Sequence, residues 1–259
     1  MTTLAARALS CYRGARAVLE AVDIAFAGGA VTAIVGPNGS GKTTLLHHLA
    51  GLDIAATGQV ELDGEPIAGL GPAVRARRIA YLPQGASVYW PLLGRDLVAL
   101  GRLPHGVDLS RPIAPSDAGA IQRALVRVDG MAFADRVIDA LSQGERARLL
   151  LARTLATEAD VLLADEPVAS LDPAYALDAM TVLRGEAQRG ACVVVSLHDL
   201  GLAARFADRV IVLANGKIAA DGSAEIALRP EVIDAAYGVG FRNVTIDGIV
   251  QPVAWSRQP

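Results

Sequence analysis

The sequence predicts an α/β fold with a mostly parallel sheet, an antiparallel β part and an inserted α-helical segment. Three observations predict it. A buried strand, a glycine-rich turn and a helix follow one another at residues 31–50. A second apolar strand, Val161–Ala164, ends in the acids Asp165 and Glu166. The stretch between them, residues 84–157, has mainly helical patterning, and strands that alternate with helices are typical of a parallel sheet.

The turn Gly36–Thr43 fits the phosphate-binding pattern G-x-x-x-x-G-K-[ST]. Its glycines let the backbone curl so that N–H groups point at one anion, and the helix that follows adds its positive end. We expect Lys42 to reach the β- and γ-phosphates of a nucleotide and the Thr43 hydroxyl to hold Mg²⁺. The nucleotide-binding residues expected here are Gly36, Asn38, Gly39, Ser40, Gly41, Lys42, Thr43 and Thr44.

Two further motifs suit the same chemistry. Asp165, at a strand's end beside the turn, suits Mg²⁺, usually through water, and Glu166 can polarise a water that attacks the γ-phosphate. Ser142 and Gly144 begin a helix with an apolar stripe, which gives a second helix N-terminus able to face an anion. Taken alone, Ser142 is more often an ordinary N-cap.

Local patterns predict the remaining elements. Gln59–Gly64 alternates and then turns, as a strand does, and Val210–Ala219 predicts a hairpin with a type I′ turn at Asn215-Gly216. Ser116 is the expected N-cap of a helix that runs to about Val128, and a short helix is expected near Pro230–Tyr237.

Composition limits the function. At 259 residues, 52% of them hydrophobic, the chain can bury a substantial core. No apolar run approaches the ~20 residues that span a bilayer, and the start lacks a signal-peptide pattern, so we expect a cytosolic chain without its own anchor. The net charge of −3 gives no basic footprint for nucleic acid. Cys11 and Cys192 have no metal or redox spacing and are expected to be buried thiols.

Together these motifs resemble the nucleotide-binding subunit of an ABC transporter, over nearly the whole chain. Gly36–Thr43 is similar to the Walker A loop and Val161–Glu166 to the Walker B strand, while Leu141–Glu145 resembles the signature usually written LSGGQ. The other matching residues are Gln84 for the Q-loop, Ser170-Leu171-Asp172 for the D-loop, His198 for the switch histidine and Tyr12 for the aromatic that stacks on adenine. The resemblance implies a P-loop NTPase (RecA-like) core that binds ATP and Mg²⁺ and hydrolyses ATP.

The resemblance also implies roles for single residues. Glu166, His198 and Gln84 are the expected catalytic residues, and the expected metal ligands are Thr43, Gln84 and Asp165. Ser142 and Gly144 are expected to meet a γ-phosphate, and Asp172 is either a helix cap or part of the communication between sites. Tyr12 either stacks on the base or is a core tyrosine. The remaining histidines, His47, His48 and His105, are expected to be structural.

The signature departs from the family at two positions, because Gln143 stands where Gly is common and Glu145 where Gln is common. Gln143 has a Cβ and adopts positive φ less freely than glycine. We expect an altered loop conformation or rate rather than loss of activity.

The resemblance implies a division of the chain and a mode of assembly. Residues 1–83 and 158–225 are expected to form an α/β lobe, 84–157 a helical lobe, and 226–259 a tail that packs on the rest. In the family, the signature of one subunit covers the nucleotide held by the other. A head-to-tail homodimer with two ATP molecules between the copies is therefore implied.

Residues 76–84, 96–105 and 165–173 resemble the importers for iron chelates, haem and cobalamin. This implies a subunit on the cytoplasmic face of the inner membrane that docks a membrane permease and serves an external substrate-binding protein indirectly. The candidate docking residues, which are alternatively core of the helical lobe, are Val88, Tyr89, Trp90, Leu92 and Leu93. The cargo itself cannot be read from an ATPase subunit.

Two other classes of protein share some of these motifs. A soluble ABC ATPase of iron–sulfur cluster assembly or nucleic-acid transactions is the alternative, and co-purification with a permease or with cluster proteins would separate the two. Nucleic-acid types usually carry a coiled-coil insertion or tandem domains, and neither pattern occurs here. A regulator without hydrolysis would lack Glu166 or His198, and both are present.

Overall fold

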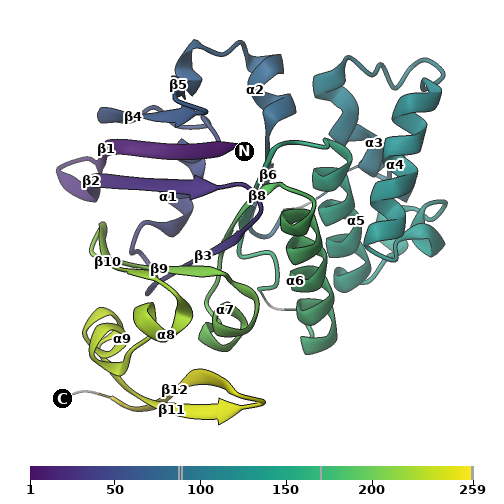
Figure 1. The fold of residues 1–259 in the computed structure, drawn as a ribbon. Helices are drawn as coiled ribbons and strands as arrows, with labels where there is room; N and C mark the ends of the chain where they lie inside the picture. The colour runs from purple at the N-terminus through teal and green to yellow at the C-terminus, as the bar shows by residue number, and fades with distance from the viewer. Residues whose placement is uncertain (87, 89, 170, 258–259) are drawn as a thin grey trace.

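The computed structural model describes residues 1–86, 88, 90–169 and 171–257. A six-stranded sheet forms its centre (Figure 1). Five adjacent strands of this sheet, β9, β3, β8, β7 and β6, run parallel to one another. The sixth strand, β10, pairs antiparallel with β9 at one edge. The strands, in spatial order, are β10 (Lys217–Gly222), β9 (Arg209–Ala214), β3 (Val31–Val35), β8 (Cys192–Ser196), β7 (Val161–Asp165) and β6 (Ile79–Leu82).

A second, antiparallel sheet covers one face of the central sheet, with helix α1 (Lys42–Leu49) between the two sheets. Side chains alternate along a strand, so β3 sends Ile34 toward this layer and Val31, Ala33 and Val35 toward the opposite face. The second sheet has the order β2 (Arg16–Ala27), β1 (Thr3–Arg13), β4 (Thr57–Leu62) and β5 (Glu65–Pro66).

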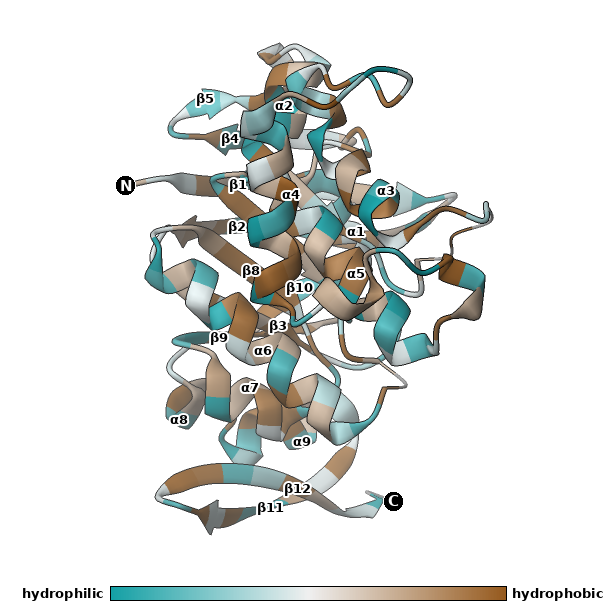
Figure 2. Cartoon of the chain, turned by 90° about the vertical axis from the view of Figure 1, so that its right-hand side faces the viewer, coloured by the Kyte–Doolittle hydropathy of each residue, from teal (hydrophilic) through white to brown (hydrophobic). Residues whose placement is uncertain are grey.

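Helices cover the other face and extend beyond the sheet. Helices α6 (Pro173–Gln188) and α7 (Leu200–Phe206) pack in the same hydrophobic core as the helical segment. That segment lies beyond the β6 edge, and Figure 2 shows it facing the viewer. It contains α3 (Gly94–Ala99), α4 (Pro115–Arg127) and α5 (Gln143–Ala156), and α2 (Pro72–Arg78) precedes β6. Short 3₁₀ turns lie at Ile67–Gly69, Leu100–His105, Met131–Phe133 and Ile138–Ala140.

The C-terminal part is more ordered than the sequence suggested. Helix α8 (Ala224–Ala227) leads to α9 (Pro230–Tyr237), which confirms the predicted short helix. Beyond it the strands β11 (Val239–Ile246) and β12 (Ile249–Arg257) form an antiparallel hairpin that was not predicted. Its turn, Asp247-Gly248, has positive φ at both residues.

Other local predictions can now be judged. The hairpin turn at Asn215-Gly216 is confirmed, because both residues have positive φ and Ala214 pairs with Lys217. The N-cap prediction for α4 was wrong: Ala114 is the N-cap and Pro115 occupies the first turn, where its fixed φ and missing N–H cost nothing. Both cysteines are free and buried, as expected. Among the described residues, no helix combines the length and the apolar character that crossing a bilayer requires.

Candidate functional site

Most of the predicted site residues meet at the carboxyl ends of the parallel strands. The phosphate-binding loop Gly36–Thr43 follows β3, Gln84 follows β6, Glu166 follows β7 and His198 follows β8. They border an open polar cleft of about 760 Å³. The predicted residues on its wall are Tyr12, Asn38, Gly39, Gly41, Lys42, Thr43, Thr44, Gln84, Glu166 and His198.

Close packing explains two of the three glycines of the loop. Gly36 has φ +152°, and a Cβ there would lie 2.1 Å from the carbonyl oxygen of Leu213 in β9. Gly41 has φ +108°, and its Cβ would lie 2.8 Å from the Leu19 side chain in β2. The loop is therefore held between the two sheets, and a larger residue at either position would displace it.

Lys42 lies at the start of α1 and is buried. Its Nζ donates to the carbonyl oxygens of Gly36 at 2.8 Å and Pro37 at 3.3 Å, so the side chain is curled back over the loop. Burial lowers the pKa of Lys42, and the nearby charges of Glu166 and Asp165 oppose that shift. This arrangement favours an anion beside the ammonium group, because an anion would offset the lost hydration.

Ser196, at the end of β8, organises the two acids. Its hydroxyl donates to Asp165 Oδ1 at 2.5 Å and accepts from the Glu166 N–H at 2.9 Å. Asp165 is 1% exposed, and Tyr81 donates to its other oxygen at 3.4 Å. Sequence reasoning missed Ser196, although a hydroxyl at the end of the strand Val193-Val194-Val195 was a visible signal.

Glu166 has φ +47°, an unusual conformation for a residue with a side chain, and the hydrogen bond from its N–H helps to hold it. Its carboxylate lies between two predicted catalytic residues. The Gln84 side-chain amide donates to Oε2, and His198 Nε2 contacts Oε1. The structure thus brings together Gln84, Glu166 and His198 beside the phosphate-binding loop.

The outer part of the cleft carries aromatic and basic side chains. Tyr12 is 55% exposed at the end of β1, so it is not a core tyrosine, and base stacking stays a prediction. Arg13 and Arg16 lie beside it on the same wall. His47 and His48, which were expected to be structural, also line the cleft. His47 contacts the Asp53 carboxylate at 3.2 Å. His105 instead contacts the Thr157 carbonyl oxygen at 2.9 Å.

The predicted signature residues lie outside this cleft, at the exposed start of α5. Ser142 is the N-cap: its hydroxyl accepts from the Glu145 N–H at 3.3 Å, and the Glu145 carboxylate accepts from the Ser142 N–H at 2.6 Å. This capping box, with a contact from Arg136 at 3.1 Å, lowers the pKa of Glu145. The Cβ of Gln143 causes no backbone strain, because Gln143 lies in the first turn of α5 and its φ is not positive. An altered rate stays a prediction.

The predicted D-loop lies against the start of α5. Asp172 caps α6, since its carboxylate accepts from the Tyr175 N–H at 2.9 Å, which confirms the cap reading. A Cβ on Gly144 would lie 3.9 Å from the Asp172 carboxylate. Ser170 falls outside the described residues. A role of Asp172 in communication between sites stays a prediction.

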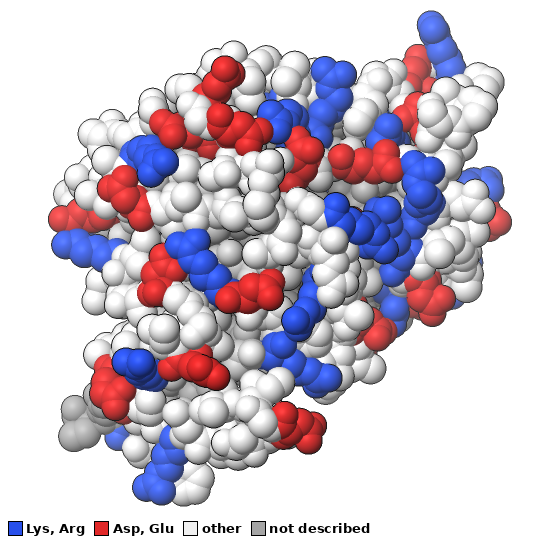
Figure 3. Space-filling model, in the orientation of Figure 1, with Lys and Arg blue, Asp and Glu red and all other residues white. Residues whose placement is uncertain are grey.

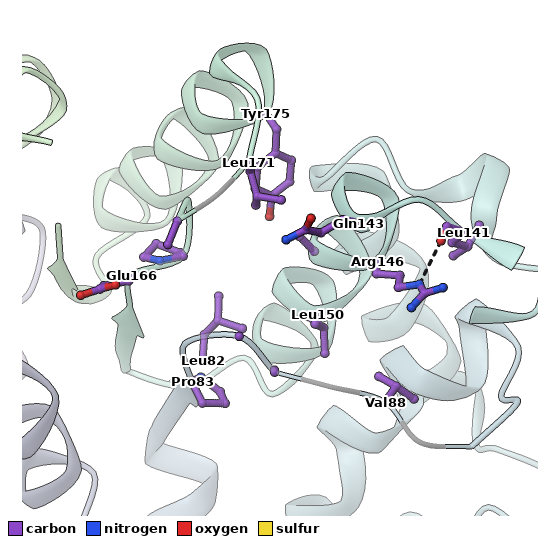
Figure 4. Close-up of a pocket in the computed structure, with 15 residues that line it drawn as sticks. Leu82, Pro83, Val88, Leu141, Gln143, Arg146, Leu150, Glu166, Leu171 and Tyr175 are labelled. Carbon is purple, nitrogen blue, oxygen red and sulfur yellow. Dashed lines mark hydrogen bonds between the residues drawn. The ribbon is translucent and has the colours of Figure 1, made fainter. Parts of the chain in front are cut away.

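A second cavity of about 420 Å³ lies between these helix starts and the segment after Gln84. Figure 4 shows Gln143 pointing into it toward Leu171 and Tyr175, while the Glu166 carboxylate points away. Arg146 does not enter as a free charge, because it donates to the Leu141 carbonyl oxygen at 2.9 Å.

The candidate docking residues separate into two groups. Trp90 is 70% exposed, whereas Val88 and Leu92 pack against the core and Leu93 is half-buried. Tyr89 falls outside the described residues. Trp90 is therefore the candidate that a partner could contact. The surface in Figure 3 carries acidic and basic side chains of both signs, largely interspersed.

A parallel sheet with a glycine loop, a buried lysine and two acids at its carboxyl edge defines the P-loop nucleoside triphosphatases. A family model described as "ABC transporter" matches residues 19–169. The chain belongs to this family, as an ATP-binding subunit that hydrolyses ATP.

Relatives of known function extend this match. The hemin import ATP-binding protein HmuV of Nocardia farcinica (strain IFM 10152) is 44% identical over 91% of this chain and 82% of its own length. HmuV of Vibrio vulnificus (strain YJ016) is 38% identical over 95% of this chain and 96% of its own. A solved metal-chelate type ABC transporter, at 23% identity, has the same fold, with a TM-score of 0.85 over 98% of both chains.

Proposed function

We propose that this chain is the ATP-hydrolysing subunit of a hemin importer, peripheral to the membrane on its cytoplasmic side. Hemin is proposed as the cargo because the chain is 44% identical to a hemin import ATP-binding protein over 91% of its length. The observation that carries the chemistry is the Glu166 carboxylate, held by Gln84 and His198 beside the phosphate-binding loop.

The donor set fits Mg²⁺ as the metal that accompanies ATP. The Thr43 hydroxyl is exposed on the cleft wall and the Gln84 side chain borders the same cleft, while the buried Asp165 lies behind. These oxygens are hard ligands of the kind Mg²⁺ prefers, and a buried carboxylate suits contact through water. Bound there, Mg²⁺ would neutralise charge on the β- and γ-phosphates.

The residues of the chain supply the remaining steps. Lys42 would exchange its carbonyl partners for phosphate oxygens, and the N–H groups of the loop would point at the same anion. Glu166 would accept a proton from the attacking water, and His198 would donate to the γ-phosphate. Ser142 and Gly144 lie outside this cleft, so they would act on the nucleotide of a second copy. This is the reason to propose a head-to-tail dimer.

The proposed lobes each carry one half of such a composite site. Residues 1–83 and 158–225 would carry the phosphate-binding half of the site, and 84–157 the half offered to the partner. Trp90, on the helical side, would contact the permease, because an exposed tryptophan is a typical interface anchor.

The test is hydrolysis by the complete transporter in vesicles. Hemin delivered by its binding protein should stimulate ATP hydrolysis, and cobalamin should not. Trp90→Ala should reduce this stimulation at least about fivefold, the loss expected of an interface anchor, while the isolated chain keeps its basal rate. Met131→Ala, which alters another exposed apolar residue of the helical side, is the matched control. Stimulation by cobalamin alone, or purification with soluble cluster-assembly proteins, would contradict the proposal.

A further inference from the structure

The C-terminal hairpin β11–β12 exposes much apolar surface for its size. Five large apolar side chains are between 39% and 65% exposed: Val244, Ile246, Val250, Val253 and Trp255. Figure 2 shows brown stretches along both strands at this end of the molecule. The hairpin is anchored through β12, where Pro252 is buried and the Gln251 side chain lies against Gly201 of α7. The register places Val244, Ile246 and Val253 on one face of the hairpin and Val250 on the other. Large apolar side chains exposed together on one face mark a contact surface.

The outer edge of β11 is open. Ile246 pairs with Ile249 across a two-residue turn, so its backbone groups bond to β12, as do those of Val244 and Arg242 at alternate positions. The N–H and C=O groups of Asn243 and Thr245 therefore point away from β12. Residues 242–246 are all exposed, so nothing described covers this edge. The N–H of Phe241, which also points outward, is already bonded to Asp234 Oδ1 at 2.8 Å.

This edge lacks the usual protection against strand pairing. Proteins guard open edges with charges, proline or bulges. The strands β2 and β10, at the ends of the two larger sheets, carry Glu20, Asp23, Lys217 and Asp221. The segment Asn243–Ile246 has no charged residue and no proline, and its pairing with β12 is regular.

We propose that this edge pairs with the same edge of a second copy of the chain, as antiparallel β11 strands related by a two-fold axis. In the register that places Asn243 opposite Thr245 of the copy, the outward backbone groups of both residues bond across the axis, and Val244 faces its own counterpart. Arg242 then lies opposite Ile246 of the copy at each end, so no like charges face each other across the pair.

The position of the hairpin suits such a contact. Figures 1 and 2 place it at the end of the molecule away from α3 and α4, so it leaves the proposed permease side free. The proposal rests on the proposed function in one respect: two copies bound to one transporter share an effective concentration in the mM range, at which even a short strand pair forms. The hairpins then join the subunits without nucleotide, on the axis that relates the two ATP sites.

Two cysteine variants, each assembled with the permease into the nucleotide-free transporter, test the register. Val244→Cys should form a disulfide-linked dimer, because the residue faces itself in a non-hydrogen-bonded pair, the closest position between antiparallel strands. Ile246→Cys is the matched control, since it lies on the same strand with similar exposure. Its two copies would be about 13 Å apart, too far to link. The native cysteines are buried and should not contribute.

Sedimentation of the isolated nucleotide-free chain at concentrations up to about 1 mM, which matches the effective concentration on the transporter, gives the strength of the contact. Thr245→Pro removes an outward N–H without disturbing the bonds to β12, so it should raise the dimer dissociation constant at least about tenfold. ATP binding by the monomer should be unchanged. Equal linking of the two cysteine variants, no linking in either, or capture of Val244→Cys by the permease would overturn the proposal.

The outcome is separable from that of the proposed function. A Glu166→Gln chain that dimerises with ATP while Val244→Cys does not link overturns the hairpin contact alone. Linking without ATP-dependent dimerisation overturns the nucleotide sandwich alone.

Discussion

The chain presents two helix N-termini to phosphate in opposite ways. Helix α1 begins at Gly41 with no side-chain cap and no acid in its first turn, and Lys42 is folded against the loop. Helix α5 begins with a complete capping box, and its first turn carries the acid Glu145. The first N-terminus is open to an anion, whereas the second is already satisfied by the chain's own carboxylate. We therefore expect α1 to supply the phosphate affinity of the single chain, and α5 to contribute only when the nucleotide of a second copy competes with its cap.

The largest expected effect is a loss of ATP hydrolysis without a loss of ATP binding at the N-termini of α1 and α5. Glu166→Gln keeps the side-chain shape but removes the proton acceptor, so turnover should fall about 10²–10⁴-fold. ATP should remain bound and the dimer should persist, as measured by retained nucleotide and sedimentation. Hydrolysis near the wild-type rate would remove Glu166 from its proposed role.

The second largest effect should be a loss of ATP affinity when the lysine at the uncapped N-terminus of α1 is removed. Lys42→Ala removes a buried charge that would bind phosphate, and charge-assisted hydrogen bonds of this kind contribute about 1.5–3 kcal/mol. ATP affinity of the isolated chain should fall about 10–100-fold in a titration with a fluorescent analogue. Lys217→Ala, at an exposed lysine in β10, is the control. Unchanged affinity would discredit the phosphate-loop assignment.

The third effect should be a weaker ATP-driven dimer when the serine at the capped N-terminus of α5 is replaced. Ser142→Ala removes the hydroxyl that would contact the γ-phosphate of the partner's nucleotide, and such a hydrogen bond contributes about 1 kcal/mol, or roughly a factor of five in an equilibrium. ATP-driven dimerisation should weaken by about that factor, while ATP affinity of the monomer stays the same. Ser223→Ala, at an N-cap without a side-chain hydrogen bond, should change neither quantity. A loss of monomer affinity would mean that α5 acts on its own chain's nucleotide.

The smallest effect sharpens the comparison. Glu145→Gln retains an oxygen for the Ser142 N–H but removes a negative charge from the helix start. ATP-driven dimerisation should strengthen about twofold, because an anion near a helix N-terminus is disfavoured by a second one. The measurement is the dissociation constant of the ATP-bound dimer, determined for Glu145→Gln and for the unchanged chain under the same conditions. A weaker dimer would show that the pairing of Glu145 with Arg136 matters more than its charge.

Motifs with fixed spacing made much of the fold predictable. The phosphate-binding loop, the strand ends that carry Glu166 and His198, and the turn Asn215-Gly216 each have a local rule that the structure obeys. Local rules failed where several residues compete for one position, and Pro115 therefore displaced the expected start of α4.

Contacts between distant segments were not predictable. The bridge from Ser196 to Asp165 and Glu166 depends on the register of β7 and β8, which no single sequence states. The β11–β12 hairpin was different, because Asp247-Gly248 between two apolar runs is a standard two-residue turn signal. That signal was present and was overlooked.

The turn Asn215-Gly216 has a practical consequence for anyone who labels this protein. It looks like an ordinary hairpin tip, the kind of position normally chosen for a tag or reporter insertion. Yet the Gly216 N–H donates to the Ser40 carbonyl oxygen at 3.2 Å, and a Cβ at Gly216 would meet the Val18 carbonyl oxygen at 2.5 Å. An insert there would break this hydrogen bond and displace the phosphate-binding loop that Ser40 belongs to.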